Sequence, residues 1–194
     1  MNEKQIEELI ENLEHKKIQF ADGLTNEELE IVESKFKLRF PPDLKLFLQT
    51  KLPISENFVN WKLGINSEIE SQKIIEKINW PLKGLLFDIK ENDFWLHEWS
   101  DKPDTLEERI EIAKEKFSNF PKLIPIYSHR YIPETPYRNG NPIFSVYQMD
   151  IIYYGFDLAN YFSSEFDFKL SNNFEKLERP INHIEFWSDF VENY

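Results

Sequence analysis

The sequence predicts a single α+β domain, and three observations lead to this prediction. Residues 120–162 are rich in apolar and aromatic residues, with turn-forming residues at regular intervals, as is typical of paired strands. Apolar residues at helical spacing recur before and after this stretch. With 194 residues, 41% of them hydrophobic, the chain has enough apolar side chains for one core. We therefore expect one domain over residues 1–194, with a helical N-terminal layer over about 1–53, a sheet-forming part over about 84–157 and a closing helix over about 183–192.

The N-terminal layer is predicted from three helical patterns. Apolar residues at i, i+3, i+4 and i+7 from Ile6 to Leu13 form one stripe of a first helix. Thr25 and Glu28 form a capping box, which indicates the start of a second helix. Pro42 suits the first turn of a third helix, because its missing N–H has no partner to lose there. These three helices are expected to pack as one layer.

The middle of the chain is predicted to contain two helices and a hairpin. A capping pattern at residues 67–70 starts a helix that we expect to stop at Trp80. The apolar runs GLLFDI (84–89) and FWLHEW (94–99) predict two strands joined by a polar tetrapeptide. A narrow apolar stripe over residues 106–117 then predicts a further helix.

The central stretch gives the clearest strand signals. Leu123–Tyr127 is predicted to be a buried strand. The β-branched and aromatic runs Ile143–Gln148 and Ile151–Phe156 are predicted to pair as a hairpin around the loop Met149–Asp150. Asp157 stands where the N-cap of a following helix would stand. The sheet is therefore expected to be centred on these runs.

Composition limits the function classes. The net charge of −12 argues against binding to nucleic acid or to anionic membranes, and it suits a basic partner protein. The chain has no cysteine, so disulfides and thiolate metal sites are excluded. No apolar run approaches the ~20 residues of a membrane span, and the start of the chain reads as an acidic amphipathic helix, so we expect a cytoplasmic protein. Phosphate-loop, dinucleotide, nucleophile-elbow and paired-histidine motifs do not occur, so no cofactor, metal or catalytic residue is predicted.

The polar group His129-Arg130-Tyr131 interrupts the apolar central stretch and is open to two interpretations. An arginine flanked by aromatic residues can anchor a protein partner. Alternatively, Arg130 forms an internal ion pair, with Asp150 as the expected acid, while His129 bonds a loop carbonyl. We favour the internal role for Arg130.

Two further places hold candidate binding residues. Trp95 and Trp99 would share one face of the predicted strand, where they could belong either to the core, which we slightly favour, or to a binding surface. Tyr153 and Tyr154 would point to opposite faces of their strand, so that one hydroxyl should reach water. The predicted partner-binding residues are Trp95, Trp99, His129, Arg130, Tyr131 and Tyr154, and the predicted structural pair is Arg130 with Asp150.

Residues 24–48 (LTNEELEIVESKFKLRFPPDLKLFL) resemble the N-terminal signature of the SUKH superfamily, in its branch related to fungal regulators of cell-wall synthesis. The later runs GLLFDI, FWLHEW, LIPIYSHRYIP, GNPIFSVYQMDIIYYG and DLANYF resemble a bacterial and plant subset of that branch. The resemblance implies an α+β fold with helices packed on one face and the edges of a twisted, mainly antiparallel sheet. It also implies a non-enzymatic interaction module, since many members are immunity proteins that neutralise secreted toxins by binding. The sequence departs from many relatives after the second helix of this signature, where residues 50–53 replace a Gly/Asn-rich loop.

Three function hypotheses follow. The leading one is a cytoplasmic immunity protein that binds a basic toxin domain, such as a nuclease. The second is a regulatory or adaptor module for a cellular protein. The third is a small hydrolase using His129 with Asp150 or Glu134. An exposed hairpin edge would also permit a homodimer.

Overall fold

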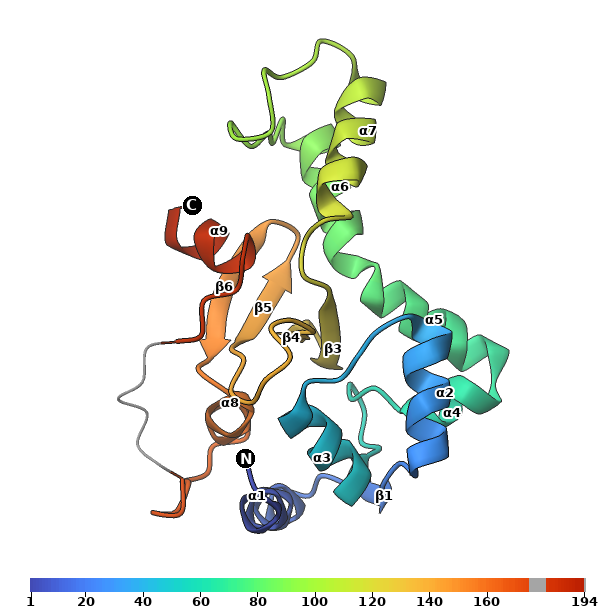
Figure 1. Cartoon of the computed structure of the whole chain (residues 1–194), viewed down its shortest axis with the longest axis vertical. Coiled ribbons are helices and arrows are strands. Elements are labelled where there is room, and N and C mark those ends of the chain that lie inside the picture. Colours follow the sequence, from blue (N-terminus) through green and yellow to red (C-terminus); the bar gives the residue numbers. More distant parts are fainter. Residues whose placement is uncertain (175–180, 194) are drawn as a thin grey trace.

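The computed structural model describes residues 1–174 and 181–193, and the predicted α+β class is confirmed (Figure 1). The described helices are α1 (Glu3–His15), α2 (Asn26–Phe36), α3 (Pro42–Thr50), α4 (Trp61–Asn66), α5 (Glu68–Ile78), α6 (Trp80–Glu91), α7 (Leu106–Phe117), α8 (Leu158–Glu165) and α9 (Trp187–Asn193). The strands are β1 (Phe20–Asp22), β2 (Lys51–Pro53), β3 (Leu123–Tyr127), β4 (Arg130–Pro133), β5 (Ile143–Tyr147) and β6 (Asp150–Gly155). None of these helices has the length and apolar character needed to cross a membrane.

The main sheet is an antiparallel meander, in which β3, β4, β5 and β6 lie side by side in chain order. The predicted β5–β6 hairpin is confirmed, but its loop lies one residue earlier than expected. Tyr147 pairs with Asp150, which makes Gln148 and Met149 the loop. Gln148 has a positive φ of 56°, as tight hairpin turns require. The strand β4 was not predicted, because a charged residue at its start and the prolines that follow are more typical of a turn than of a buried strand.

The predicted N-terminal layer is confirmed in its three helices. Thr25 and Glu28 form the expected reciprocal capping box of α2, and α3 begins at Pro42. The chain before α2 and the chain after α3 also pair as a small antiparallel sheet, β1 with β2. Residues 51–53, which stand in place of the Gly/Asn-rich loop of many SUKH proteins, therefore form a strand that pairs with β1 rather than an open loop.

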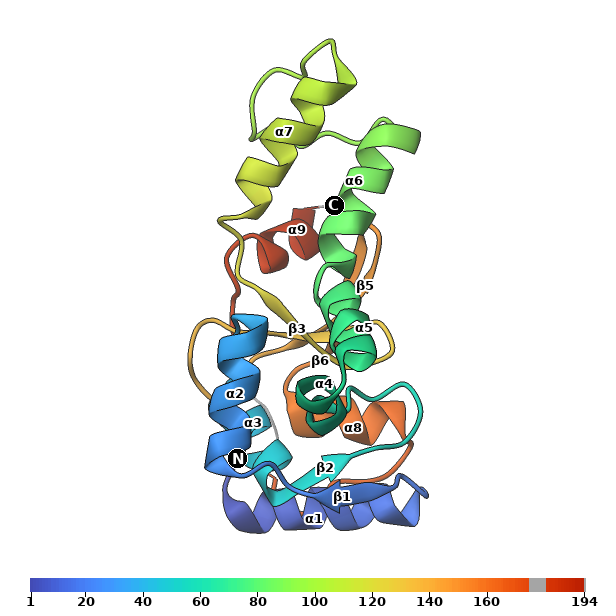
Figure 2. The same cartoon turned by 90° about the vertical axis from the view of Figure 1, so that its right-hand side faces the viewer.

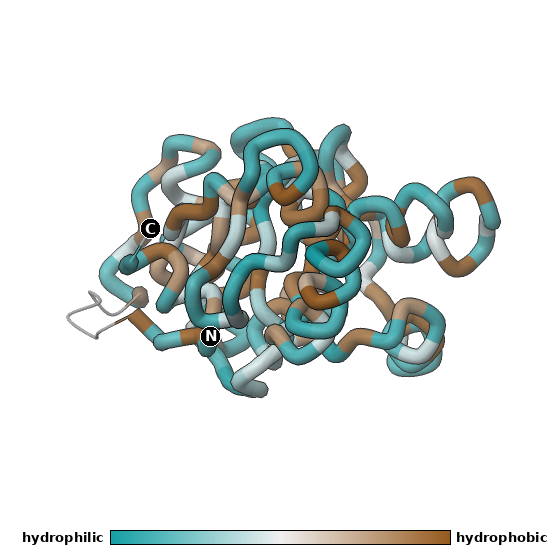
Figure 3. Tube along the Cα trace, turned by 90° about the horizontal axis from the view of Figure 1, so that it is seen from above, coloured by the Kyte–Doolittle hydropathy of each residue, from teal (hydrophilic) through white to brown (hydrophobic). Residues whose placement is uncertain are grey.

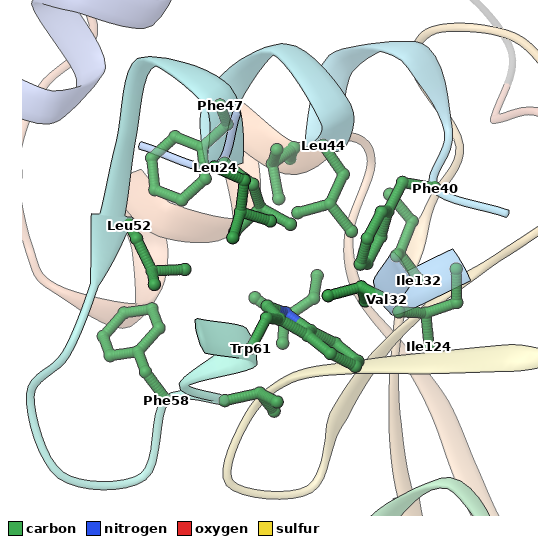
Figure 4. Packing of buried hydrophobic residues seen from close by; sticks show 14 of the residues in the cluster. Leu24, Val32, Phe40, Leu44, Phe47, Leu52, Phe58, Trp61, Ile124 and Ile132 are labelled. Atoms are coloured by element: carbon green, nitrogen blue, oxygen red, sulfur yellow. The ribbon is translucent and has the colours of Figure 1, made fainter. Parts of the chain in front are cut away.

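One hydrophobic cluster joins this layer to one face of the main sheet. Phe40 and Trp61 pack edge to face with ring centres 5.1 Å apart, and both are buried beside Ile124 and Ile132 of the sheet (Figure 4). Residues of α8, such as Phe162, close the same cluster. Fully burying an aromatic or aliphatic side chain of this kind stabilises a fold by about 1.5–3 kcal/mol. The helices α1, α2, α3 and α8 all contribute buried residues to this cluster.

A second cluster covers the opposite face of the sheet. Tyr131, Phe144 and Ile151 pack there against α6 and α9, whose buried residues include Leu85 and Trp187. Helices thus cover both faces rather than one face and the edges. The contact with α6 is close, because a Cβ added to Gly84 would lie 2.6 Å from the Cα of Gln148. Asp88 of α6 reinforces it by accepting the N–H of Met149 at 2.8 Å.

The hairpin predicted over residues 84–99 is wrong. Residues 84–89 belong to helix α6, with Pro81 in its first turn and Leu85 and Ile89 on its buried side. Residues 94–99 form an irregular segment with a turn at residues 97–99, and the indole N–H of Trp95 donates to the carbonyl of Ser100. A short apolar run has no period of its own, so packing against the sheet decided its structure. The sheet-forming part is therefore residues 123–155 rather than about 84–157.

The helices α6 and α7 form an arm that extends beyond the sheet, away from α1, in both perpendicular views (Figures 1 and 2). The connecting segment that holds Trp95 and Trp99 lies between these two helices, at residues 92–105. The predicted helix over residues 106–117 is confirmed as α7, and the predicted closing helix appears as the shorter α9. Figure 3 shows hydrophobic and hydrophilic residues alternating along the helices, as expected for elements with one buried side.

Candidate functional site

Polar and aromatic side chains gather where α8 leaves one face of the β5–β6 hairpin uncovered. In an antiparallel pair, residues opposite each other share a face. Arg130 pairs with Ser145, and Ser145 with Ile152, so these three form one row across β4, β5 and β6. We call this surface the sheet-face patch, and it consists of His129, Arg130, Ser145, Tyr147, Ile152, Tyr154 and Glu165.

Arg130 is the centre of the patch and is held from three sides. Its Nε lies 3.2 Å from Oε2 of Glu165, at the end of α8. Its Nη1 donates to the hydroxyl of Ser145 at 2.9 Å, and its guanidinium lies 3.6 Å from the centre of the Tyr154 ring. The internal ion pair predicted for Arg130 is thus present, but its acid is Glu165. Asp150 is exposed at the hairpin loop, paired in register with Tyr147 rather than with Arg130.

The rim of the patch is apolar and exposed. Tyr147 keeps 58% and Ile152 keeps 49% of its surface in contact with solvent. The two residues are diagonal neighbours on one face of a two-stranded hairpin, since Ser145 is opposite Ile152 and Tyr147 is two residues further. The ring of His129 lies 6.4 Å from the ring of Tyr147 and continues this rim.

Partial burial lowers the pKa of His129, and the charge of Arg130 lowers it further, while Glu165 has a smaller opposite effect. The lowered pKa favours the neutral form of the imidazole. Its Nδ1 lies 3.1 Å from the hydroxyl of Ser128. Neither acid proposed for a hydrolytic pair is in place among the described contacts: Glu134 accepts the N–H of Arg39, and Asp150 stands at the hairpin loop. The described residues also contain no group of three or more carboxylate and imidazole side chains that could hold a metal.

The other predicted partner-binding residues lie elsewhere. Tyr131 is on the opposite face of the sheet, fully buried, with its hydroxyl donating to the carbonyl of Lys77 at 2.9 Å; burial raises its pKa. Trp95 and Trp99 lie in the connecting segment of the arm, where their rings meet edge to face at 5.2 Å. Trp99 is buried in the second cluster, as we had slightly favoured, and Trp95 is half-buried against it. Of the six predicted residues, the patch brings together His129, Arg130 and Tyr154.

Sequence reasoning missed four patch residues, namely Ser145, Tyr147, Ile152 and Glu165. Tyr147 and Ile152 alternate in step with Tyr154 along the predicted hairpin, so a face assignment could have grouped them. Glu165 had no such signal, because it follows the last apolar position of α8 in a polar stretch. Residues 175–179 of that stretch, for which no structure was predicted, lie outside the described residues.

A hollow that was not predicted lies at the other end of α8. We call it the amide groove; it has a volume of about 1210 Å³ and is bordered by the starts of α1, α3 and α8 and by two loops. Asp43, at the start of α3, is buried and accepts the N–H of Gly140 at 2.8 Å and of Leu44 at 3.0 Å. Burial raises the pKa of Asp43, and these hydrogen bonds act against that change. The start of α3 and the loop that holds Asn139 and Gly140 therefore meet in its wall.

Comparisons of this chain with models of known protein families, with curated proteins and with solved structures found no match. The resemblance to the SUKH superfamily therefore stays a prediction from the sequence motifs.

Proposed function

We propose that this protein is a non-enzymatic binding module that docks a protein partner on the sheet-face patch. The observation that carries the proposal is the exposed pair Tyr147 and Ile152 on a rigid hairpin, beside the ion-paired Arg130. Tyrosine and arginine are enriched among the residues that dominate binding energy at interfaces. Because the charge of Arg130 is already matched by Glu165, a partner can cover it without stranding a charge.

The proposed partner is a basic toxin domain, such as a nuclease, which the module would neutralise by covering its active site. The net charge of −12 supports a basic partner, since opposite charges speed the encounter of two proteins. The resemblance of residues 24–48 to a superfamily rich in immunity proteins supports the same role. Contacts would come from the patch and long-range attraction from the acidic surface as a whole.

The experiment uses a tagged full-length chain to capture its partner from the cells that produce it, followed by mass spectrometry. We then expect the purified partner to be basic and its toxic activity to stop at equimolar protein. The double variant Tyr147→Ala/Ile152→Ser should bind at least tenfold more weakly than the wild type. Ile69→Ser is the matched control, because Ile69 is 72% exposed on α5 and outside the patch. Equal binding by the two variants would overturn the proposal.

The adaptor hypothesis shares the patch and differs in the partner. It is favoured by the resemblance to fungal interaction modules. If it holds, deleting the gene changes growth or the cell envelope without any attack by neighbouring cells. A deletion strain that differs from its parent only when attacked supports the immunity role instead. Homodimer formation through the outer strand β6 stays a prediction, and light scattering of the purified chain would test it.

A further inference from the structure

The amide groove is lined by an unusual number of side-chain amides. They belong to Gln5 and to six asparagines, namely Asn2, Asn139, Asn160, Asn172, Asn173 and Asn182. An amide carries both a donor and an acceptor, so it can bond one peptide group twice. The groove is also larger than the roughly 300–1,000 Å³ typical of pockets for one small molecule. Size and lining therefore suit a length of polymer rather than a compact ligand.

Several of these amides are held in place by internal hydrogen bonds. Oδ1 of Asn2 accepts the N–H of Gln5, and Oδ1 of Asn160 accepts the N–H of Phe156, both at 3.0 Å. Each leaves its NH₂ group without a bond within the described part of the chain. The NH₂ group of Asn182 donates to the carbonyl of Gly140 at 2.7 Å, and Oδ1 of Asn182 has no hydrogen bond within the described part of the chain. The groove thus offers preorganised donors and acceptors side by side, which lowers the entropic cost of binding.

The charged groups of the groove are mostly occupied. Both oxygens of Asp43 accept backbone N–H groups, and Oδ1 of Asp157 caps α8 by accepting the N–H of Asn160. Arg138 is the cationic side chain of the described lining, and the positive charge at Met1, which also lines the groove, acts against the rise in the pKa of Asp43. Few charged groups of the lining are therefore available to bind a strongly charged ligand. The lining favours a neutral ligand with many hydrogen-bonding groups.

The walls also hold fixed apolar surface. Phe156 keeps 47% of its surface exposed, and Phe174 also lines the groove. The lining contains neither tryptophan nor tyrosine, the rings on which sugar faces stack. A polypeptide in extended conformation presents N–H and C=O groups at each residue and apolar side chains at alternate residues. These features match the lining better than a neutral oligosaccharide does.

We propose that the amide groove binds an extended, uncharged polypeptide segment. The site is separate from the sheet-face patch, since the groove lies at the start of α8 and Glu165 at its end, about 12 Å away along a helix of this length. The wall is fixed by Gly140, whose N–H bonds Asp43 and whose carbonyl bonds Asn182. Its φ of +80° explains why a glycine stands there.

The test starts by panning a random linear heptapeptide phage library against the immobilised full-length chain. Selected peptides are synthesised, and their affinity is measured by fluorescence anisotropy; a neutral glycan array is probed in parallel. We expect uncharged peptides to be selected. Asn160→Leu should bind them about tenfold more weakly, since it removes one oriented amide. Asn172→Trp should bind them still more weakly, because it fills the groove without removing an internal bond of the described chain.

Tyr147→Ala is the control that separates the two sites. It should bind the selected peptides within twofold of the wild type, whatever the result for the partner captured through the patch. Peptide binding that both groove variants retain would overturn the inference, as would peptides selected for charge. Binding to glycans without binding to peptides, or no selected peptide at all, would also overturn it. Each variant is first checked for wild-type melting, so that loss of binding is not loss of fold.

Discussion

The two faces of the β5–β6 hairpin carry different chemistry because different elements cover them. On one face, Phe144, Val146 and Ile151 are buried under α6 and α9. On the other face of the same strands lie Ser145 and Ile152, beside Arg130 and only partly under α8. The closed face is held by packing, whereas the open face has one ion pair at its centre and an exposed apolar rim. Substitutions should therefore damage folding on the first face and binding on the second.

The largest effect is expected on the closed face. Phe144 is fully buried and stacks on Tyr153 with ring centres 5.2 Å apart. Phe144→Ala should lower the free energy of unfolding by about 3–5 kcal/mol, because it removes buried surface and leaves a cavity. Urea denaturation followed by circular dichroism measures this. A loss below about 1 kcal/mol would mean that the closed face is not the main support of the hairpin.

The next largest effect should come from the ion pair that spans the open face. Arg130→Ala should cost about 3 kcal/mol, at the lower end of the range for breaking a buried pair, since both partners keep some contact with water. Glu165→Ala should behave similarly, and the double variant should cost less than the two single losses together. Asp150→Asn is the control and should stay within about 0.5 kcal/mol of the wild type. Additive losses at Arg130 and Glu165 would contradict the pairing.

The tip of the hairpin tests whether α6 holds the closed face as well as covering it. Asp88→Ala should cost about 1–3 kcal/mol, because the N–H of Met149 then loses its acceptor in a buried position. Hydrogen exchange at Met149 should become faster than at residues of β3, which lies at the opposite edge of the sheet from β6. If hydrogen exchange at the Met149 amide were unchanged, packing alone would hold the hairpin tip in place.

A smaller effect is expected from pH on the open face. The folded-state pKa of His129 is lowered, so its protonation is less favourable in the folded protein than in the unfolded chain. Its contribution to stability is therefore present above the ordinary value near 6.5 and is lost as pH falls through and below that value. We expect a loss below about 1 kcal/mol, given the exposure of the ring. His129→Asn should reduce the difference between urea midpoints at about pH 7 and pH 5, and an unchanged difference would contradict the assignment to His129.

The smallest effect on stability belongs to the exposed rim. Tyr147→Ala/Ile152→Ser should change the free energy of unfolding by no more than about 0.5 kcal/mol, because both side chains already face water. The same variant should abolish most partner binding. Differential scanning calorimetry provides the stability measurement. A large drop in melting temperature would mean that Tyr147 and Ile152 stabilise the fold rather than form a binding surface.

Local signals explain which elements could be predicted from the sequence. The capping box of Thr25, the N-cap of Asp157 and the alternation of the hairpin residues each act within a few residues, and each prediction was confirmed in type. Helix α6 could not be predicted from such local signals. Its run at residues 84–89 suits a strand as well as a helix, and its contacts with Gln148 and Met149, some sixty residues away in the chain, decide its structure.

The candidate site shows the same division. His129, Arg130 and Tyr154 were predicted because they are polar or aromatic residues within an apolar stretch, and they do come together. The acid predicted to pair with Arg130 was wrong, because Asp150 lies at the hairpin loop opposite Tyr147, whereas Arg130 lies in the row of Ser145 and Ile152. Glu165 reaches Arg130 only through the packing of α8 on β6, which no pattern in the sequence reports.

The meander order of the main sheet has a consequence for how the chain folds. Each of β3, β4, β5 and β6 pairs with its neighbour in sequence, so the whole sheet can assemble from short loops between residues 123 and 155. Sheets with low contact order fold faster than those that need distant pairings. We expect this sheet to form the folding nucleus, with α1 and α9 docking from the two ends of the chain afterwards. Substitutions in the sheet would then slow folding, whereas those in α1 or α9 would mainly speed unfolding.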